Sequence, residues 1–357
     1  MADRLKDTHA ISLRMSRRRA IAGGAALAFT LPFAHSSLAQ ARKSITSTVV
    51  GGTFQKVYDE TLVKPFEAAN NVDVALKIGS PNEWLASAIM NRFAPELDVL
   101  LLPYPDSIRA VKAGICEELT VAELPNLADV YPQFIDGYAK QGVGIDFISF
   151  GLIHRTDSKL AKPVSWMDLF KPEYKGKIAI PTLSISGGVQ FLLTMAQLHG
   201  GSVDNIEPGF EAVKRMKPNI MRFYTSKSEG QQIMERGTAA LIMGEHNVAA
   251  ALIDNAVPIE FLTPAEGVMV GMISLHVVKN SKNTQAAKNF VNFTISSEAN
   301  GAFNSRLIAG PTNKKVVLKP EIAARIPTYE HLLFPDWNKI VDRLPTWLER
   351  WNREIVG

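Results

Sequence analysis

The chain has 357 residues, with 39 lysines and arginines against 35 aspartates and glutamates. Residues 1–41 contain six of the basic and two of the acidic residues, which leaves 33 of each in residues 42–357. This balance gives no support for nucleic acid or an anionic membrane as a partner, and a hydrophobic content of 46% indicates a globular chain. Because Cys116 is the single cysteine, the chain cannot form an intramolecular disulfide. We expect its thiol to be buried.

The first 41 residues have the pattern of an export leader. Arg17–Arg19 precede an apolar run from Ala22 to Phe33, and Ala39–Ala41 form a small-x-small cleavage site. This order is typical of a signal peptide, and the paired arginines indicate the twin-arginine (Tat) route. We expect a twin-arginine signal peptide at 1–41, and a soluble periplasmic protein that begins at Arg42 and has no stable membrane insertion. The alternative is an uncleaved N-terminal anchor.

Strand and helix patterns alternate after the leader. The first group consists of strands at 46–51, 72–78 and 97–102 and helices at 54–70, 81–93 and 107–113, the second helix following a Ser80–Glu83 capping box. This βαβαβ order predicts a parallel sheet with right-handed crossovers, hence an α/β fold.

The same alternation continues to the end of the chain. The expected strands are 142–152, 177–180, 220–224, 239–243, 259–262 and 269–278, and the expected helices are 164–170, 186–200, 207–216, 230–236, 248–254, 284–296 and 300–304, followed by a helical tail that carries three tryptophans. More than 300 residues in this pattern favour two lobes or domains.

Catalytic and metal-binding signatures are missing from the sequence. It contains no G-x-S-x-G, H-E-x-x-H, Walker A or C-x-x-C motif, and its seven histidines have no metal-ligand spacing. We therefore expect neither a catalytic site nor a metal or cofactor.

Turns rich in glycine, serine, threonine and aromatic residues follow several of the expected strands. Ligands bind at the carboxyl ends of strands in open α/β sheets, and helix starts there attract anions. The alternative for Ser186 and Ser226 is that they only cap helices. The candidate ligand-binding residues are Gly52, Thr53, Phe54, Trp84, Tyr104, Ser184, Ser186, Gly187, Tyr224, Glu245 and Asn247.

Several longer segments then resemble one family. They are Gly51–Phe54 with Lys64–Glu67, Glu96–Val99, Ser165–Leu169 with Lys171–Ala179, Pro264–Gly267, and Lys279–Ser281 leading into Ala286–Phe293. In this order they resemble the periplasmic solute-binding proteins of ABC importers, in the spermidine/putrescine-type branch.

That resemblance implies a two-lobe, type II periplasmic-binding-protein fold. Each lobe would be a mostly parallel sheet flanked by helices, and two crossover strands would join the lobes. Lobe 1 would be residues 44–147 plus 275–357, and lobe 2 residues 148–274. A monomer would clamp a small solute by hinge closure and deliver it to a membrane permease without chemistry.

The sequence differs from polyamine-binding proteins at the positions whose side chains bind the amines in those proteins. Gly271 and Ile273 stand where polyamine binders have a tryptophan and an aspartate, and the turn at 183–187 lacks a carboxylate. A polycation in a desolvated cleft needs paired acids, so we expect an anionic or zwitterionic solute, with Glu245 receiving an amine in the second case. A polyamine binder, an exported enzyme on a similar fold and a docking protein without a small ligand are the alternatives.

The leader gives a direct test. Mass spectrometry of the exported protein should find an N-terminus at Arg42, and replacing both Arg17 and Arg18 by lysine should block export, because the Tat route reads the arginine pair. An intact leader or a lipid adduct on the exported protein would contradict this prediction.

Overall fold

The computed structural model describes residues 42–357, and the expected leader at 1–41 lies outside the described residues. No helix within 42–357 is long and apolar enough to cross a membrane.

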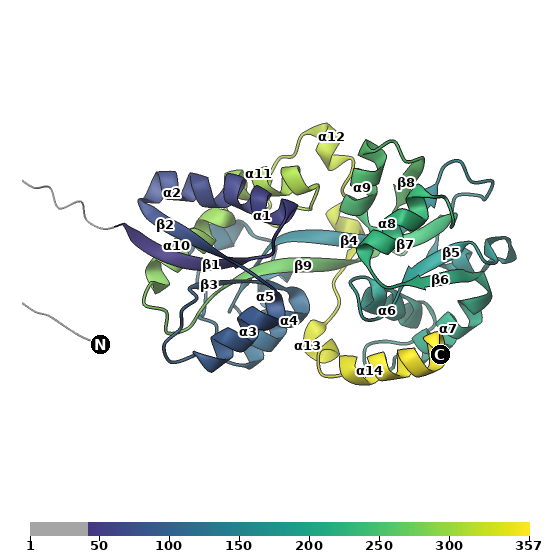
Figure 1. Cartoon of the computed structure of the whole chain (residues 1–357), viewed down its shortest axis with the longest axis horizontal. Coiled ribbons are helices and arrows are strands. Elements are labelled where there is room, and N and C mark those ends of the chain that lie inside the picture. The colour runs from purple at the N-terminus through teal and green to yellow at the C-terminus, as the bar shows by residue number, and fades with distance from the viewer. Residues whose placement is uncertain (1–41) are drawn as a thin grey trace, which may run out of the picture. The chain divides into compact units, whose positions relative to one another are not determined.

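A mixed sheet of ten strands runs through this part of the chain (Figure 1). Its order is β2-β1-β3-β9-β4-β7-β5-β6, with β10 paired to β9 and β8 paired to β4. The strands are β1 Lys43–Val49, β2 Val72–Ile78, β3 Val99–Pro103, β4 Val143–Arg155, β5 Ile178–Pro181, β6 Ile220–Tyr224, β7 Leu241–Glu245, β8 Ile259–Leu262, β9 Val268–Val277 and β10 Leu332–Leu333.

The strand directions divide the sheet into two parallel parts with an antiparallel centre. β1 is parallel to β2 and β3, and β5 is parallel to β6 and β7. The long strands β4 and β9 are antiparallel to each other and to their outer neighbours β7 and β3. The α/β class is confirmed, and the sheet is mixed because these two strands lie between the parallel parts.

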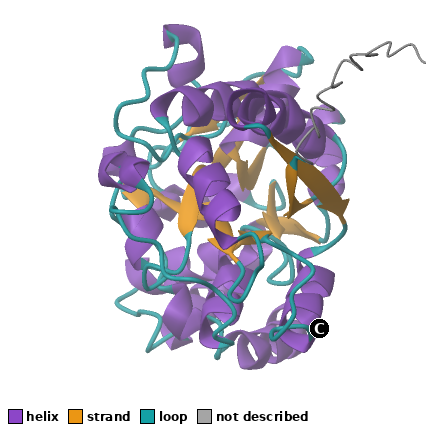
Figure 2. Ribbon diagram, turned by 90° about the vertical axis from the view of Figure 1, so that its left-hand side faces the viewer, coloured by secondary structure: helices purple, strands orange, loops and turns teal. Residues whose placement is uncertain are grey.

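Helices cover the strands on both sides (Figure 2). The α-helices are α1 Thr53–Tyr58, α2 Lys64–Asn70, α3 Pro81–Met90, α4 Tyr104–Lys112, α5 Gln133–Asp136, α6 Gly188–Leu198, α7 Glu207–Met216, α8 Lys227–Glu235, α9 His246–Asp254, α10 Thr284–Thr294, α11 Ser297–Leu307, α12 Pro320–Ala323, α13 Trp337–Ile340 and α14 Leu344–Trp351. A π-helical segment, Asp59–Val63, joins α1 to α2. The segment expected as a helix at 164–170 forms a 3-10 turn, Trp166–Phe170.

Local signals explain several boundaries. The capping box at the start of α3 is present, with the Ser80 N–H donating to Glu83 Oε2 at 2.9 Å. Ser226 caps α8, its Oγ accepting the Glu229 N–H at 3.1 Å. Cys116 is buried as expected, and burial raises the pKa of its thiol to about 12, so the thiol stays protonated at neutral pH.

The last helices contact elements on both sides of the β4–β9 pair. The Trp337 ring on α13 lies 6.3 Å from the Tyr104 ring on α4. Trp351 on α14 donates from Nε1 to Thr182 Oγ1 at 3.1 Å, and Arg350 pairs with Glu207 at 2.9 Å. The expected division places Thr182 and Glu207 in lobe 2 and α14 in lobe 1. The division stays a prediction, and these contacts favour moving α14 into lobe 2.

Asn300 on α11 provides a test of how β4 is anchored. Its buried Nδ2 donates to the Ile145 carbonyl on β4 at 2.8 Å, and its Oδ1 accepts the Thr312 N–H at 2.9 Å. Asn300→Ala leaves the buried Thr312 N–H without that partner, while Asn304 Nδ2 still donates to the Ile145 carbonyl at 2.9 Å. The free energy of unfolding should fall by about 1–3 kcal/mol. Urea unfolding followed by tryptophan fluorescence measures this, with the exposed Asn289→Ala as control. Equal losses in the two variants would contradict the prediction.

Candidate ligand-binding site

A cavity of about 400 Å³ lies against β4 and β9. The turns after β3, β5 and β6 reach it, which is the arrangement expected for the carboxyl ends of parallel strands. It is lined by Pro103–Asp106, Asp146, Ile148, Phe150, Leu183–Ser186, Val189, Gln190, Lys227, Gly271–Ile273, Trp337 and Leu344.

A bulge in β4 determines which side chains line the cavity. The register with β9 shifts between Gly144 and Asp146, which leaves Ile145 without a partner in the ladder. Side chains alternate along a strand, and a bulge re-aims them. From this point Asp146, Ile148 and Phe150 line the cavity. Ser149, on the opposite face, donates its N–H to His246 Nδ1 at 2.9 Å.

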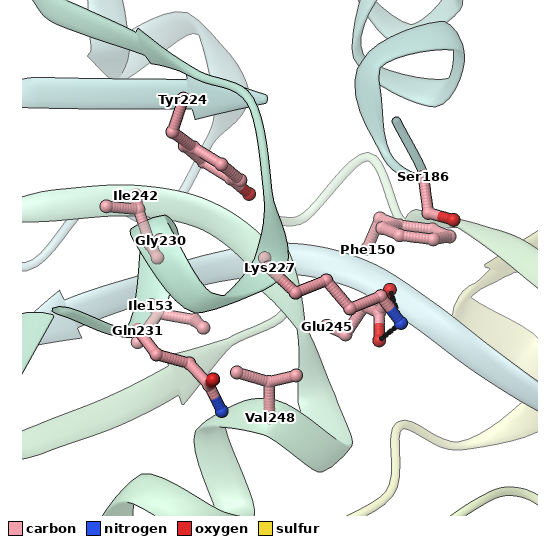
Figure 3. A pocket seen from close by; sticks show the side chains of 11 residues that line it. Phe150, Ile153, Ser186, Tyr224, Lys227, Gly230, Gln231, Ile242, Glu245 and Val248 are labelled. Atoms are coloured by element: carbon pink, nitrogen blue, oxygen red, sulfur yellow. Dashed lines mark hydrogen bonds and ion pairs between the residues drawn. The ribbon is translucent and has the colours of Figure 1, made fainter. Parts of the chain in front are cut away.

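Three of the predicted residues line this cavity, namely Tyr104, Ser184 and Ser186. Two more, Tyr224 and Glu245, lie beside it in a hollow of about 20 Å³ that Ser186 and Lys227 also line (Figure 3). The Tyr224 hydroxyl donates to the Met243 carbonyl at 2.6 Å. It therefore supports the wall of the site.

The other predicted residues, all within 42–357, lie outside this lining. Trp84 is 1% exposed and belongs to a hydrophobic cluster under α3. Phe54 packs against the Phe303 ring at 5.5 Å, while Gly52 and Thr53 are exposed. Asn247 uses its Oδ1 to accept the Val248 N–H. For these five residues and for Gly187, a contact with the ligand stays a prediction.

The start of α6 is built differently from the expected anion site. The Gly187 N–H donates to Gln190 Oε1 at 3.2 Å, and the Gly188 N–H donates to the Ile185 carbonyl at 3.2 Å. Gly187 is the N-cap residue, with φ near +95°, and no side chain caps the helix. Ser186 is therefore not the cap of α6. Donors for an anion at this turn are the hydroxyls of Ser184 and Ser186.

Asp146 is a site residue that the sequence reasoning missed. Its side chain is 3% exposed, and Oδ1 accepts the Ile273 N–H at 2.9 Å. Burial raises the pKa of Asp146 to about 7; the Ile273 N–H and Lys227 oppose this rise and Glu245 adds to it. The available signal was an acid inside an apolar strand, since such strands are buried.

Lys227 is the second missed residue. Its Nζ lies 2.7 Å from Glu245, whose side chain is 5% exposed (Figure 3). Lys227 is the first residue of α8. A lysine in the first turn of a helix usually lies on the solvated surface, so the sequence did not indicate a role in the site. Among residues 42–357 no group of three His, Cys, Asp or Glu side chains is placed to hold a metal ion.

The comparisons with known proteins identify the family. The family model for bacterial extracellular solute-binding proteins matches residues 61–328. The chain belongs to this family. The spermidine/putrescine-binding periplasmic protein of Escherichia coli K12 is 26% identical over 243 residues, which cover 65% of this chain and 67% of that protein. Spermidine/putrescine-binding periplasmic protein 1 of Haemophilus influenzae is 20% identical, covering 73% of this chain and 74% of its own.

Solved structures of solute-binding proteins have the same fold. An ABC transporter structure from Clostridium perfringens superposes with a TM-score of 0.80 at 24% identity and covers 87% of this chain and 99% of its own. AttC of Agrobacterium tumefaciens, in its open unliganded conformation, gives 0.75 at 17% identity and covers 88% and 99%. The type II periplasmic-binding fold is confirmed, and the protein is a solute-binding protein of the ABC-transporter class. Its family and these neighbours are transport proteins.

The buried carboxyl of Asp146 makes a pH-dependent contribution to stability. The pKa of Asp146 is about 7 in the folded protein, above its usual value of 3.8. Between about pH 4 and 7 the folded state therefore holds a proton on this carboxyl, whereas the unfolded chain has released it. The free energy of unfolding should therefore fall as pH rises from about 4 to 7, by about 4 kcal/mol at most, relative to Asp146→Asn. Urea unfolding across this range measures it. Neutralising the exposed Glu235 by Glu235→Gln is the control, and parallel curves for wild type and Asp146→Asn would contradict the assignment.

Proposed function

We propose that the protein binds a small solute carrying one protonated amine and an anionic or polar end, and delivers it to an ABC permease. The observation that carries this proposal is Asp146, a buried carboxyl in the cavity wall. Its hydrogen bond within the described chain comes from a neutral N–H, that of Ile273. A buried carboxylate needs a cation or a proton. A ligand ammonium is the cation that an open cavity can receive.

The cavity walls fit a short apolar body between two polar ends. Ile148, Ile273 and Leu344 are among the apolar lining residues. Lys227 and the Ser184 hydroxyl, which also line the cavity, are donors for an anionic group. This arrangement matches the zwitterionic form of the expectation.

Trp337 also belongs to the cavity wall and carries a buried donor. Its indole N–H is buried without a hydrogen-bond partner within the described residues, and its ring lines the cavity. A buried donor left unpaired costs about 1–3 kcal/mol. A ligand acceptor that reached this N–H would recover part of that cost.

A purely anionic solute fits less well. Asp106 and Asp146 line the cavity together with one lysine, Lys227. Asp106 is paired with Arg109 at 3.0 Å, so Asp146 is the carboxyl that would repel an anion without an amine to offset it. The names of the Escherichia coli and Haemophilus influenzae relatives, which bind spermidine and putrescine, also support an amine.

The remaining parts of the proposal concern how the protein works. It acts as a periplasmic monomer exported by the Tat route and closes by a hinge in β4 and β9. These strands link the parallel parts of the sheet (Figure 1). The two lobes are those expected from the sequence, with α14 moved to the second.

Titration calorimetry on the mature protein tests the ligand class. The panel is butylamine, 4-aminobutyrate, putrescine, spermidine and succinate. We expect binding of a mono-amine, with 4-aminobutyrate favoured, and a loss of about 2–5 kcal/mol in Asp146→Asn, because the ammonium loses its charge partner. Glu235→Gln is the matched surface control. Binding of succinate alone, or unchanged binding by Asp146→Asn, would contradict the proposal, and tight spermidine binding by the wild type would favour the polyamine alternative.

A further inference from the structure

We propose that Lys227 restricts this site to solutes with a single cationic group. Its ammonium occupies, against Glu245, the place that a second ligand amine would take. This inference rests on the proposed function, because it assigns the first amine to Asp146. It goes further by naming the residue that separates mono-amines from diamines.

Lys227 pairs with Glu245 as the ammonium group of a bound amine would. The lysine Nζ lies 2.7 Å from Glu245 Oε1 and 2.7 Å from Oε2, so the ammonium bridges both carboxylate oxygens. Charge-assisted bonds of this kind are stronger than neutral ones. In Figure 3 the lysine side chain extends to Glu245, with Phe150 and Ser186 beside the pair.

Lys227 enters this position from the rim of the cavity. Its side chain is 55% exposed, whereas that of Glu245 is 5% exposed. Lys227 lies in the first turn of α8, a helix capped by Ser226, and α8 buries Ile233 and Met234. The lysine is therefore a separable part of the wall, and shortening or neutralising it leaves the helix cap and the core contacts in place.

The charges around the cavity support one ligand cation. Asp146 and Glu245 are both more than nine-tenths buried. Asp146 lines the cavity, Glu245 lines the adjoining hollow, and Lys227 lines both. These three groups leave one carboxylate without a cationic partner. Removal of the lysine charge would leave two, which is the arrangement that a diamine requires.

The two carboxylates lie on the same face of the sheet. The negative charge of Glu245 raises the pKa of Asp146. Glu245 and Phe150 are paired in the register of β7 and β4, and Phe150 follows Asp146 on the cavity face of β4. A chain of a few carbons that reached both acids would run along Ile148 and Phe150.

The test compares two four-carbon probes that differ at one end. Putrescine has an amine at both ends, and 4-aminobutyrate has a carboxylate at one of them. Titration calorimetry should show that Lys227→Met binds putrescine at least ten-fold more tightly than the wild type does and binds 4-aminobutyrate more weakly. Lys227→Arg should keep the wild-type preference, because it keeps the charge. Adding Glu245→Gln to Lys227→Met should remove the gain for putrescine.

Two controls separate this inference from general electrostatics and from the proposed function. Lys175→Met removes an exposed lysine charge elsewhere and should leave both affinities unchanged. Circular dichroism and the melting temperature confirm that each variant is folded. A folded Lys227→Met protein without a gain in putrescine affinity overturns this inference, even when the wild type binds a mono-amine. Failure of the wild type to bind any amine overturns the proposed function itself.

Discussion

The pairing of β4 with β9 is the constraint on which the fold and the site depend. These two strands lie between the parallel groups on either side and join them into one sheet. They also carry the cavity floor, because the β4 bulge at Ile145 brings Asp146 opposite Ile273. The unpaired carbonyl of Ile145 is satisfied by Asn300 and Asn304 of α11. A feature of the backbone thus places a buried acid in the cavity wall.

The polar groups at this site gain their strength from burial. A carboxylate on the surface is solvated, and its pairing with a lysine contributes little. Asp146 and Glu245 are instead surrounded by Ile148, Phe150 and neighbouring apolar side chains, which makes the absence of a cation costly. Glu245 is paired with the ammonium of Lys227, whereas within residues 42–357 Asp146 accepts a hydrogen bond only from the backbone N–H of Ile273. Under the proposed function, this difference makes the cavity suited to one ligand cation.

The C-terminal segment adds a second link between the halves of the sheet. Trp337 contacts Tyr104, while Trp351 hydrogen-bonds to Thr182, and Trp337 and Leu344 form part of the cavity wall. The proposed hinge movement would have to accommodate this segment in addition to the two long strands. Lys339 and Arg343 both pair with Asp204, which holds the segment to the loop before α7.

Local patterns in the sequence determined the elements of the fold. The bounds of β2, α7 and β6 are confirmed to the residue. The rule for sheet edges also found Tyr104, Ser184 and Ser186. Only the tertiary structure decided the rest. Trp84 faces the core because packing selects the buried face of α3. Asp146 and Lys227 become site residues because a bulge and a helix start, far apart in the chain, meet at one cavity, and no local pattern records such a meeting.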